Sequence, residues 1–304
     1  MISENSIKTD NDLRLFYSQY QKKNRKLLRS GYPLVPLFEF NEIKDRLFLV
    51  KDGEKLISSF AVSKEEMENK KVWMIAHFYI IDNTIIKRKK EEFLACIRRV
   101  IKDDYDLKII IQIEDYLKAE SLFLQDISAE FDHFTVRLIN DLRDFQAEER
   151  NDINVNDEFS LRTFQIGKDE EMFMHIFNNT FKHLCSPITL QNVESWVHSD
   201  KFNPSCYIFA VKKKEVIGFI AIEVYSDKLD EGRFSYLQEI GVLDSFKDQG
   251  IGSRLLYAGI SAAKKAGSNR MGVGVLGRNK SAFRFFQNNG FKEVYKKNYL
   301  KIII

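Results

Sequence analysis

The segment Phe234–Gly267, FSYLQEIGVLDSFKDQGIGSRLLYAGISAAKKAG, contains a strand, a glycine-containing turn and a helix in direct succession. Its first part, Tyr236–Val242, is a short and largely apolar run that predicts a strand. Its last part carries apolar residues at helical spacing and then a glycine suited to a helix C-terminus: Ile251, Leu255, Leu256, Ile260 and Gly267. The sequence KDQGIG, Lys247–Gly252, therefore connects the end of a strand to the beginning of a helix.

The turn Lys247–Gly252 has the features of an anion-binding loop. Gly250 and Gly252 have no Cβ atoms, so a ligand can approach the backbone closely. The first N–H groups of the following helix have no partners within the helix, and the positive end of the helix dipole attracts negative charge. The turn therefore predicts a pyrophosphate site, against the alternative of a strand-to-helix turn that binds nothing.

Two other nucleotide-binding motifs fit this turn poorly. A Walker-type loop closes with Gly-Lys-Ser/Thr, whereas Gly252 is followed by Ser253 and Arg254. A dinucleotide-binding fingerprint requires a third small residue where Leu255 stands, and an acidic residue about 20 positions later. A Rossmann-type nucleotide binder is therefore the weakest of the alternatives.

The segment NKSAFRFFQNNGF, which begins at Asn279, adds a second motif. With both motifs in order, the last third of the chain resembles the GNAT superfamily of N-acetyltransferases, which binds acyl-CoA. The family's loop pattern, Arg/Gln-x-x-Gly-x-Gly/Ala, falls on Lys247, Gly250 and Gly252, with Lys247 departing from Arg/Gln. Its later pattern, Asn-x-x-Ala-x-x-Phe-Tyr-x-x-x-Gly-Phe, falls on these residues, with phenylalanine in the tyrosine place: Asn279, Ala282, Phe285, Phe286, Gly290 and Phe291.

The resemblance implies that acetyl-CoA is the co-substrate, and no metal cofactor is expected because the histidines and cysteines lack metal-ligand spacing. The acceptor amine would attack the thioester carbonyl directly, with a backbone N–H at or beside Val242 facing the thioester oxygen. The residues expected to bind acetyl-CoA are Ile240, Gly241, Val242, Lys247, Asp248, Gln249, Gly250, Ile251, Gly252, Ser253, Asn279, Ala282, Phe285 and Phe286.

Glu239 is the residue expected to accept the proton of the amine. The resemblance implies that a carboxylate on this strand, or a water held by it, takes the proton. Glu239 is the only carboxylate between Tyr236 and Leu243. The alternative is a glutamate at an edge or bulge that points to solvent. Tyr236, Gln238 and Glu223 are the next candidates.

Phe286 stands where the family has the tyrosine that protonates the leaving thiolate, and phenylalanine cannot donate a proton. A thiol with a pKa of ~8.5 is a tolerable leaving group without that proton. Tyr257, Tyr295 and Tyr299 are alternative donors, among which the sequence leaves the choice open.

The two halves of the chain correspond at an offset of roughly 160 residues, a period of domain size. FLVKDGEKLISSF from Phe48 and FAVKKKEVIGF from Phe209 each predict a hairpin. We interpret the chain as a tandem pair of GNAT-like domains with mixed α/β sheets, residues 1–145 and 158–304, joined by a polar linker at 143–157. Arg88 and Lys90 fall on the two glycines of the turn, where their side chains would obstruct a ligand. The first domain is therefore expected to be degenerate.

Each half also begins with a helical pattern, at Asp10–Arg29 and at Glu170–Leu184. The segment Arg162–Asp169 is similar to the same region of mycothiol synthases, which are tandem acetyltransferases with a degenerate N-terminal half. This resemblance supports the architecture more than it indicates a substrate.

The composition limits the functions to be considered. The 304 residues suffice for two domains, and 44% apolar with 30% charged residues is typical of a globular protein. A net charge of +3 with mixed signs argues against a nucleic-acid partner, and no apolar run approaches the ~20 residues of a membrane span. The three cysteines and five histidines lack metal-ligand spacing, and the cysteines predict reduced thiols in the cytoplasm.

We therefore expect a monomeric, cytoplasmic N-acetyltransferase that moves an acetyl group from acetyl-CoA to the primary amine of a small molecule. The rival class is an acyl-CoA-binding protein without turnover, such as a sensor, in which Phe286 and Lys247 mark the decay of an active site. The identity of the acceptor is not readable, because the residues that select it lie on loops without a code.

Overall fold

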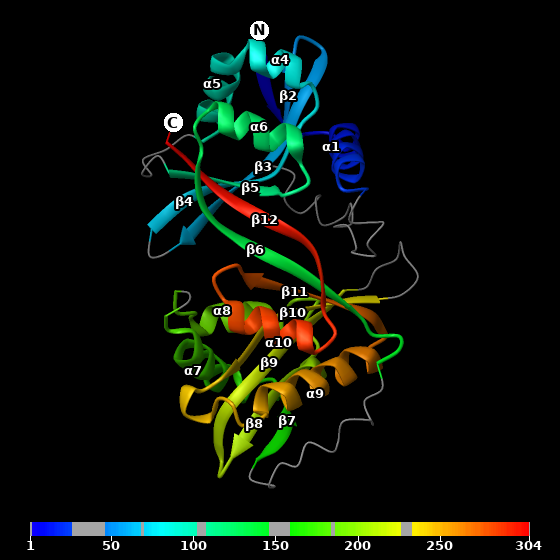
Figure 1. Ribbon diagram of the computed structural model, residues 1–304, viewed down its shortest axis with the longest axis vertical. Coiled ribbons are helices and arrows are strands. Elements are labelled where there is room, and N and C mark those ends of the chain that lie inside the picture. The colour runs from blue at the N-terminus through cyan, green and yellow to red at the C-terminus, as the bar shows by residue number, and fades with distance from the viewer. Residues whose placement is uncertain are drawn as a thin grey trace. The chain divides into compact units, whose positions relative to one another are not determined.

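Figure 1 shows the protein as a computed structural model, which describes residues 2–25, 46–67, 70–101, 108–145, 159–183, 186–225 and 233–303. The chain forms two compact units. Unit 1 comprises Met1–Arg137, Val275–Phe285 and Glu293–Ile304, and unit 2 comprises Leu138–Gly274 and Phe286–Lys292. Each unit therefore combines residues from distant parts of the sequence.

The first half of the sequence supplies most of unit 1. Its elements are β1 (Ile2–Ser6), α1 (Asp10–Lys23), β2 (Leu47–Asp52), β3 (Lys55–Met67), β4 (Lys70–Ile80), α4 (Asn83–Arg88), α5 (Lys90–Val100), β5 (Lys108–Glu114), α6 (Lys118–Asp126) and β6 (Glu130–Asp141).

The second half supplies most of unit 2. Its elements are β7 (Ser160–Thr163), α7 (Glu170–Phe181), α8 (Leu190–Val197), β8 (Tyr207–Lys212), β9 (Glu215–Tyr225), β10 (Arg233–Val242), α9 (Ile251–Lys265), β11 (Ser268–Leu276), α10 (Lys280–Asn288) and β12 (Lys292–Ile303), with short 3-10 turns at Pro204–Cys206 and Asp244–Phe246.

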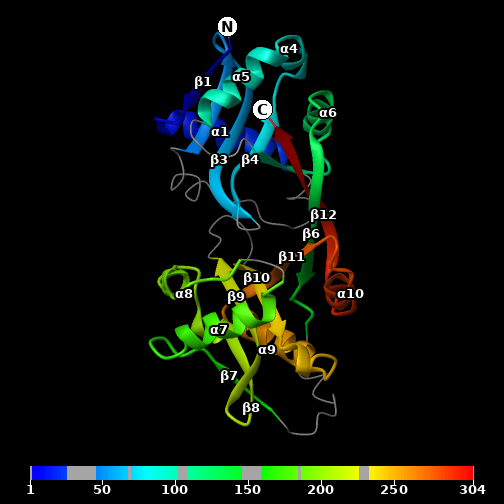
Figure 2. The same cartoon turned by 90° about the vertical axis from the view of Figure 1, so that its left-hand side faces the viewer.

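The strands of the described residues follow the hydrogen-bonded order β1-β2-β3-β4-β5-β12-β6-β11-β10-β9-β8-β7. The pairs β4–β5 and β10–β11 are parallel and their outer neighbours are antiparallel, so the sheet is mixed as predicted. The C-terminal strand β12 pairs antiparallel with β5, from Lys297↔Glu114 to Ile303↔Lys108, and lies beside β6 in both views (Figures 1 and 2). The last strand of the second half therefore completes the sheet of unit 1. Neither β12 nor β1 was predicted from the sequence.

Both predicted hairpins are confirmed. β2 and β3 pair around a turn in which Gly53 has φ +61°. β8 and β9 pair around Lys213 and Lys214, whose φ values are +49° and +73°. Two successive residues with positive φ are typical of a type I′ turn, which matches the twist of the flanking strands.

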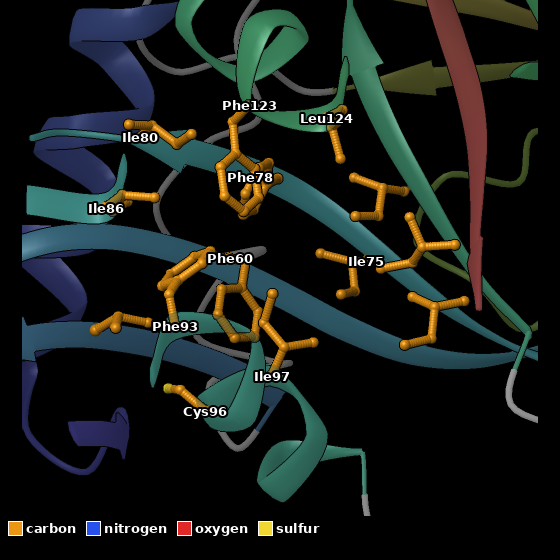
Figure 3. Close-up of a cluster of buried hydrophobic side chains, with 14 of the residues drawn as sticks. Phe60, Ile75, Phe78, Ile80, Ile86, Phe93, Cys96, Ile97, Phe123 and Leu124 are labelled. Carbon is orange, nitrogen blue, oxygen red and sulfur yellow. The ribbon is translucent and has the colours of Figure 1, made fainter. Parts of the chain in front are cut away.

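Helices cover both faces of the sheet in unit 1. On one face Phe60 and Phe78 pack with Phe93 of α5 and Phe123 of α6, and the ring centroids of Phe93 and Phe123 are 5.4 Å apart (Figure 3). On the other face, α1 buries Leu13, Phe16 and Tyr20 against residues of β2, β3 and β4. Burial of this many large apolar side chains gives the unit its own core.

Unit 2 is also covered on both faces. α7 and α8 bury Phe173, Phe177 and Val193 against Phe219 and its neighbours. α9 lies close to the opposite face, because a Cβ at Gly259 would come within 2.6 Å of Ile222 Cδ1.

The beginnings of α1 and α7 are fixed by polar contacts. The Thr9 hydroxyl accepts the Asp12 N–H at 3.1 Å. The buried Asp169 carboxylate, directly before α7, accepts two hydrogen bonds from the Arg162 guanidinium at 2.6 and 3.0 Å. The ends predicted for these helices, at Arg29 and Leu184, lie outside the described residues, as do residues 146–157 of the predicted linker.

Candidate active site

β10 and β11 are neighbours only in their first parts. Their parallel register runs from Arg233↔Ser268 to Leu237↔Val273, whereas β10 continues to Val242. β10 remains paired with β9 as far as Val242↔Gly218. Within the described residues, the edge of positions 239–242 that faces β11 therefore has no strand partner. Its backbone groups can pair with the amide groups of a bound ligand.

A β-bulge lies where the two strands part. Leu237 pairs with Ile222 and Glu239 pairs with Ala221, so Gln238 is an extra residue in β10. Directly opposite residues of an antiparallel pair point to the same face. Glu239 therefore lies on the face of Ala221, two residues from Phe219, whose ring packs 5.1 Å from Phe173 of α7.

The Glu239 side chain is partly buried rather than exposed. Among the described residues no cation or hydrogen-bond donor contacts its carboxyl group, and burial raises its pKa from 4.5 to about 7. The bulge considered in the sequence analysis is thus present, but the carboxyl group does not point into open solvent. A carboxyl with this pKa changes its protonation state near neutral pH.

Gly241 allows α7 to approach β10 closely. A Cβ at Gly241 would lie 2.4 Å from Thr180 Cγ2 and 3.2 Å from Phe219 Cε1. The Thr180 hydroxyl is buried and has no hydrogen-bond partner in the part of the chain that the structure describes. This contact was not predicted from the sequence, because it appears only once the helix is packed on the paired strands.

The predicted anion-binding turn leads directly into α9. Gly250 has φ +77° and is the N-cap of the helix, and Asp248 has φ +60°. The helix begins with the hydrogen bond from the Arg254 N–H to the Gly250 carbonyl, at 3.1 Å. The N–H groups of residues 251–253 precede this bond, so they are the unpartnered donors of a helix N-terminus. This backbone geometry fits a pyrophosphate.

Side chains of the turn make local contacts. The Lys247 ammonium forms an ion pair with Asp244 Oδ1 at 2.6 Å, and Gln249 donates to the Ser245 carbonyl at 3.2 Å. Lys247 is more than half exposed, so it can exchange Asp244 for a bound anion.

The second predicted motif begins with a helix cap. Asn279 Oδ1 accepts the Ala282 N–H at 3.0 Å at the beginning of α10. Asn279, Ala282 and Phe285 belong to unit 1, whereas positions 239–253 and Phe286 belong to unit 2. The structure therefore brings Glu239 together with the turn in one unit.

Phe286, in the tyrosine place of the family pattern, is buried and packs edge-to-face on Phe291 at 5.2 Å. Of the alternative tyrosines, Tyr257 in unit 2 donates to Asn289 Oδ1 at 3.2 Å. Tyr295 and Tyr299 are buried in β12 of unit 1.

A polar network adjoins the bulge. Glu223 of β9 lies opposite Tyr236 of β10. Glu223 Oε2 accepts hydrogen bonds from the Tyr225 hydroxyl at 2.8 Å and from Gln238 Nε2 at 2.7 Å. The extra residue of the bulge thus holds the carboxylate of the neighbouring strand.

In unit 1 a glutamate side chain binds the corresponding strand end. β4 and β5 also part early, after Ile75↔Ile111. Ile80 falls on Val242 when Arg88 is aligned with Gly250, and its N–H donates to Glu120 Oε1 at 2.7 Å. Glu120 is fully buried and also accepts from Lys23 Nζ at 2.8 Å. The strand-end amide of the first half is therefore already bonded.

The turn of the first half also differs. Arg88 ends α4, and Lys89, with φ −115°, connects it to α5. The Lys89 ammonium binds Asp52 Oδ1 at 2.7 Å. This turn thus has no left-handed glycine, in agreement with the difference that the sequence shows at Arg88 and Lys90.

Within the described ranges there is no group of three or more His, Cys, Asp or Glu side chains that could hold a metal ion. Among the helices of these ranges, none is long and apolar enough to cross a membrane. Cys96 and Cys206 are buried free thiols, and Cys185 lies outside the described residues.

Comparison with known sequences relates the second half to a family. Residues 170–291 match the acetyltransferase (GNAT) family. A mycothiol acetyltransferase from Paenarthrobacter aurescens (strain TC1) is 26% identical over 143 residues, which are 46% of this chain and 44% of that protein. The similarity to this relative thus spans less than half of its length.

Solved structures resemble the chain over nearly its whole length. A tandem GNAT protein from the clavulanic acid biosynthesis pathway has a TM-score of 0.72 at 9% identity, covering 99% of this chain and 98% of that chain. A GCN5-related N-acetyltransferase from Sphaerobacter thermophilus has a TM-score of 0.71 at 13% identity, covering 99% and 95%. At such identities the likeness shows the fold, and it confirms the predicted tandem architecture.

Proposed function

We propose, on the premise that residues 170–291 belong to the GNAT acetyltransferase family, that the protein transfers the acetyl group of acetyl-CoA to the primary amine of a small molecule. One observation carries this proposal. In unit 2 an unpaired strand edge, a carboxyl group with a raised pKa and a glycine-led helix N-terminus follow one another within Glu239–Ser253.

The turn before α9 would bind the pyrophosphate of acetyl-CoA. The N–H groups of Ile251, Gly252 and Ser253 supply donors, and the left-handed Gly250 keeps the approach free of a side chain. Lys247, Asp248 and Gln249 would line the same turn. The motif resemblance adds Asn279, Ala282, Phe285 and Phe286 to the proposed binding residues.

The open edge of β10 would hold the acyl end. Ile240, Gly241 and Val242 lie on the part of β10 that β11 leaves unpaired, so their backbone groups can pair with the amides of the pantetheine arm. An N–H at or beside Val242 would donate to the thioester oxygen and stabilise the charge that develops there. When bound, acetyl-CoA supplies an activated acyl group with a thiolate as its leaving group.

Glu239 would accept the proton of the amine. Its pKa of about 7 means that a large fraction is ionised at neutral pH while the group is still basic enough to take a proton. The buried Phe286 cannot protonate the thiolate, so the thiolate would leave unprotonated or take a proton from Tyr257 or from water.

Two observations favour the rival function, an acyl-CoA-binding protein without turnover. Phe286 is packed against Phe291 as a core residue, and Lys247 is paired with Asp244. A protein that binds acyl-CoA without turnover would still need the turn before α9, but it would not need the tyrosine that protonates the thiolate.

Steady-state release of free thiol from acetyl-CoA, measured with a panel of amines, amino acids, peptides and aminoglycosides, separates the two functions. The proposal predicts thiol release that depends on an amine and is matched by one acetylated amine per thiol. Saturable binding of acetyl-CoA without thiol release for any amine would contradict it and support the rival. Binding of NAD(P) in place of acetyl-CoA would contradict both.

A further inference from the structure

Glu223 and Glu239 lie on one face of the strand pair β9–β10. Glu239 pairs with Ala221, and Glu223 pairs with Tyr236. Residues opposite each other share a face, and so do residues two apart on a strand, such as Ala221 and Glu223. Diagonal neighbours in an antiparallel pair are about 7–8 Å apart. A short aliphatic chain with a nitrogen at each end spans a separation of this size.

Among the described residues, the groups that hold the Glu223 carboxylate in place carry no charge. Both groups that donate to its Oε2, the Tyr225 hydroxyl and the Gln238 amide, are uncharged. In the described part of the chain Oε1 has no hydrogen-bond partner, and no lysine or arginine forms an ion pair with Glu223. The Lys201 ammonium lies 4.8 Å above the Tyr225 ring. A carboxylate that receives only uncharged hydrogen-bond donors from the described residues can bind a positively charged nitrogen.

The negative charge of Glu223 also affects the pKa of another side chain on this face, Tyr207. Tyr207 of β8 lies opposite Ala221, so Tyr207, Ala221 and Glu239 form one row across three strands. Burial raises the pKa of Tyr207, and the charge of Glu223 raises it further.

We propose that Glu223 binds a second, positively charged nitrogen of the acceptor, and that the acceptor is a small diamine. This inference rests on the proposed function. One nitrogen lies at Glu239 and reacts, while the other remains an ammonium at Glu223. In the reaction a bond forms between the first nitrogen and the acetyl carbon and the C–S bond breaks. The amine proton passes to Glu239, and the electron pair of the C–S bond leaves with the thiolate.

Three acceptors of equal chain length test the inference: 1,4-diaminobutane, butylamine and 4-aminobutanoate. They share a four-carbon skeleton with one primary amine, and the far end is positive, uncharged or negative, respectively. The full-length protein should acetylate the diamine with a kcat/KM about 10- to 100-fold above that for butylamine, as expected for one charge-assisted hydrogen bond. The difference should lie mainly in KM, and 4-aminobutanoate should be the poorest of the three.

Glu223→Gln keeps the shape of the side chain and removes its charge. It should lower kcat/KM for the diamine to about the level for butylamine, and Glu223→Lys should favour 4-aminobutanoate. The matched control is Glu215→Gln, an exposed position at the beginning of the same strand, which should leave the order unchanged. Thermal unfolding of each variant shows whether it is folded. A merely structural role for Glu223 would not change the order of the acceptors.

The outcomes separate this inference from the function on which it rests. Turnover of butylamine and the diamine with equal kcat/KM, or an unchanged order in Glu223→Gln, overturns the role of Glu223 and leaves the acetyltransferase proposal standing. Turnover of other amines but of none of these three also overturns the inference. Absence of thiol release with every amine overturns the proposed function and the inference together.

Discussion

Replacing Glu239 by glutamine should change the pH profile of acetyl transfer. Burial raises the pKa of the Glu239 carboxyl to about 7, and this group is proposed to take the proton of the amine. The kcat/KM of the unmodified protein should therefore rise with pH until Glu239 is ionised. Glutamine cannot accept the proton, so Glu239→Gln should lower turnover and lose this acidic limb. Its affinity for acetyl-CoA should stay nearly unchanged, because the loss lies in the transition state.

The same substitution should change stability in a pH-dependent manner. The pKa of Glu239 is higher in the folded protein than its ordinary value of 4.5, so the folded state binds this proton more tightly. The stabilising contribution is complete at low pH and is lost as the pH rises through about 7. With ~1.36 kcal/mol for each unit of pKa difference, the loss amounts to up to about 3 kcal/mol. Glutamine does not titrate, so the variant should gain stability relative to the wild type as the pH rises.

Urea unfolding of the wild-type protein and Glu239→Gln, between about pH 5 and about pH 8.5, measures this difference. The exposed Glu215→Gln serves as the control. The difference between wild type and Glu239→Gln should grow as the pH rises from about 5 to about 7 and stay constant above that, and the control should follow the wild type. Parallel curves for all three proteins would refute the burial argument. A wild-type acidic limb in Glu239→Gln would show that another group takes the proton.

Three further predictions follow from single contacts. Gly241→Ala should lower the free energy of unfolding by about 1–3 kcal/mol, because its Cβ would lie 2.4 Å from Thr180 Cγ2. Adding Thr180→Ser to Gly241→Ala should restore most of the lost free energy of unfolding. If Gly241→Ala costs the same with and without Thr180→Ser, the clash is disproved. Glu120→Ala should lower the free energy of unfolding by about 3 kcal/mol, because the Ile80 N–H loses its buried acceptor. Glu120→Ala should not create a second acetyl-CoA site in calorimetry. A new site would show that Glu120 alone prevents the first half from binding acetyl-CoA. Deletion of β12 should increase hydrogen exchange in β5, its antiparallel partner, and unchanged protection of β5 would contradict the pairing.

The features predicted correctly from the sequence depend on neighbouring residues. The hairpin turns follow from residues such as Gly53 between apolar runs, and the helix after Gly250 follows from its apolar spacing. The difference between the halves was also visible locally, because Arg88 and Lys90 stand in place of the two glycines. Such signals need no knowledge of which strands pair.

The features that were missed depend on pairing between distant segments. β12 has an apolar C-terminal pattern, but nothing in its own residues indicates that it joins β5 of the first half. Glu120 reaches Ile80 across 40 residues. The contact between Gly241 and Thr180 likewise appears only when α7 is placed on the sheet. Register and packing of this kind are set by the whole fold rather than by local propensity.

We expect the chain to bind one molecule of acetyl-CoA, at the turn before α9. Calorimetric titration of the full-length protein with acetyl-CoA measures the number of sites and the affinity. One site per chain is predicted, lost in Gly250→Arg and retained in Arg88→Gly, with circular dichroism confirming that each variant is folded. Two equivalent sites, or unchanged affinity in a folded Gly250→Arg, would contradict the claim.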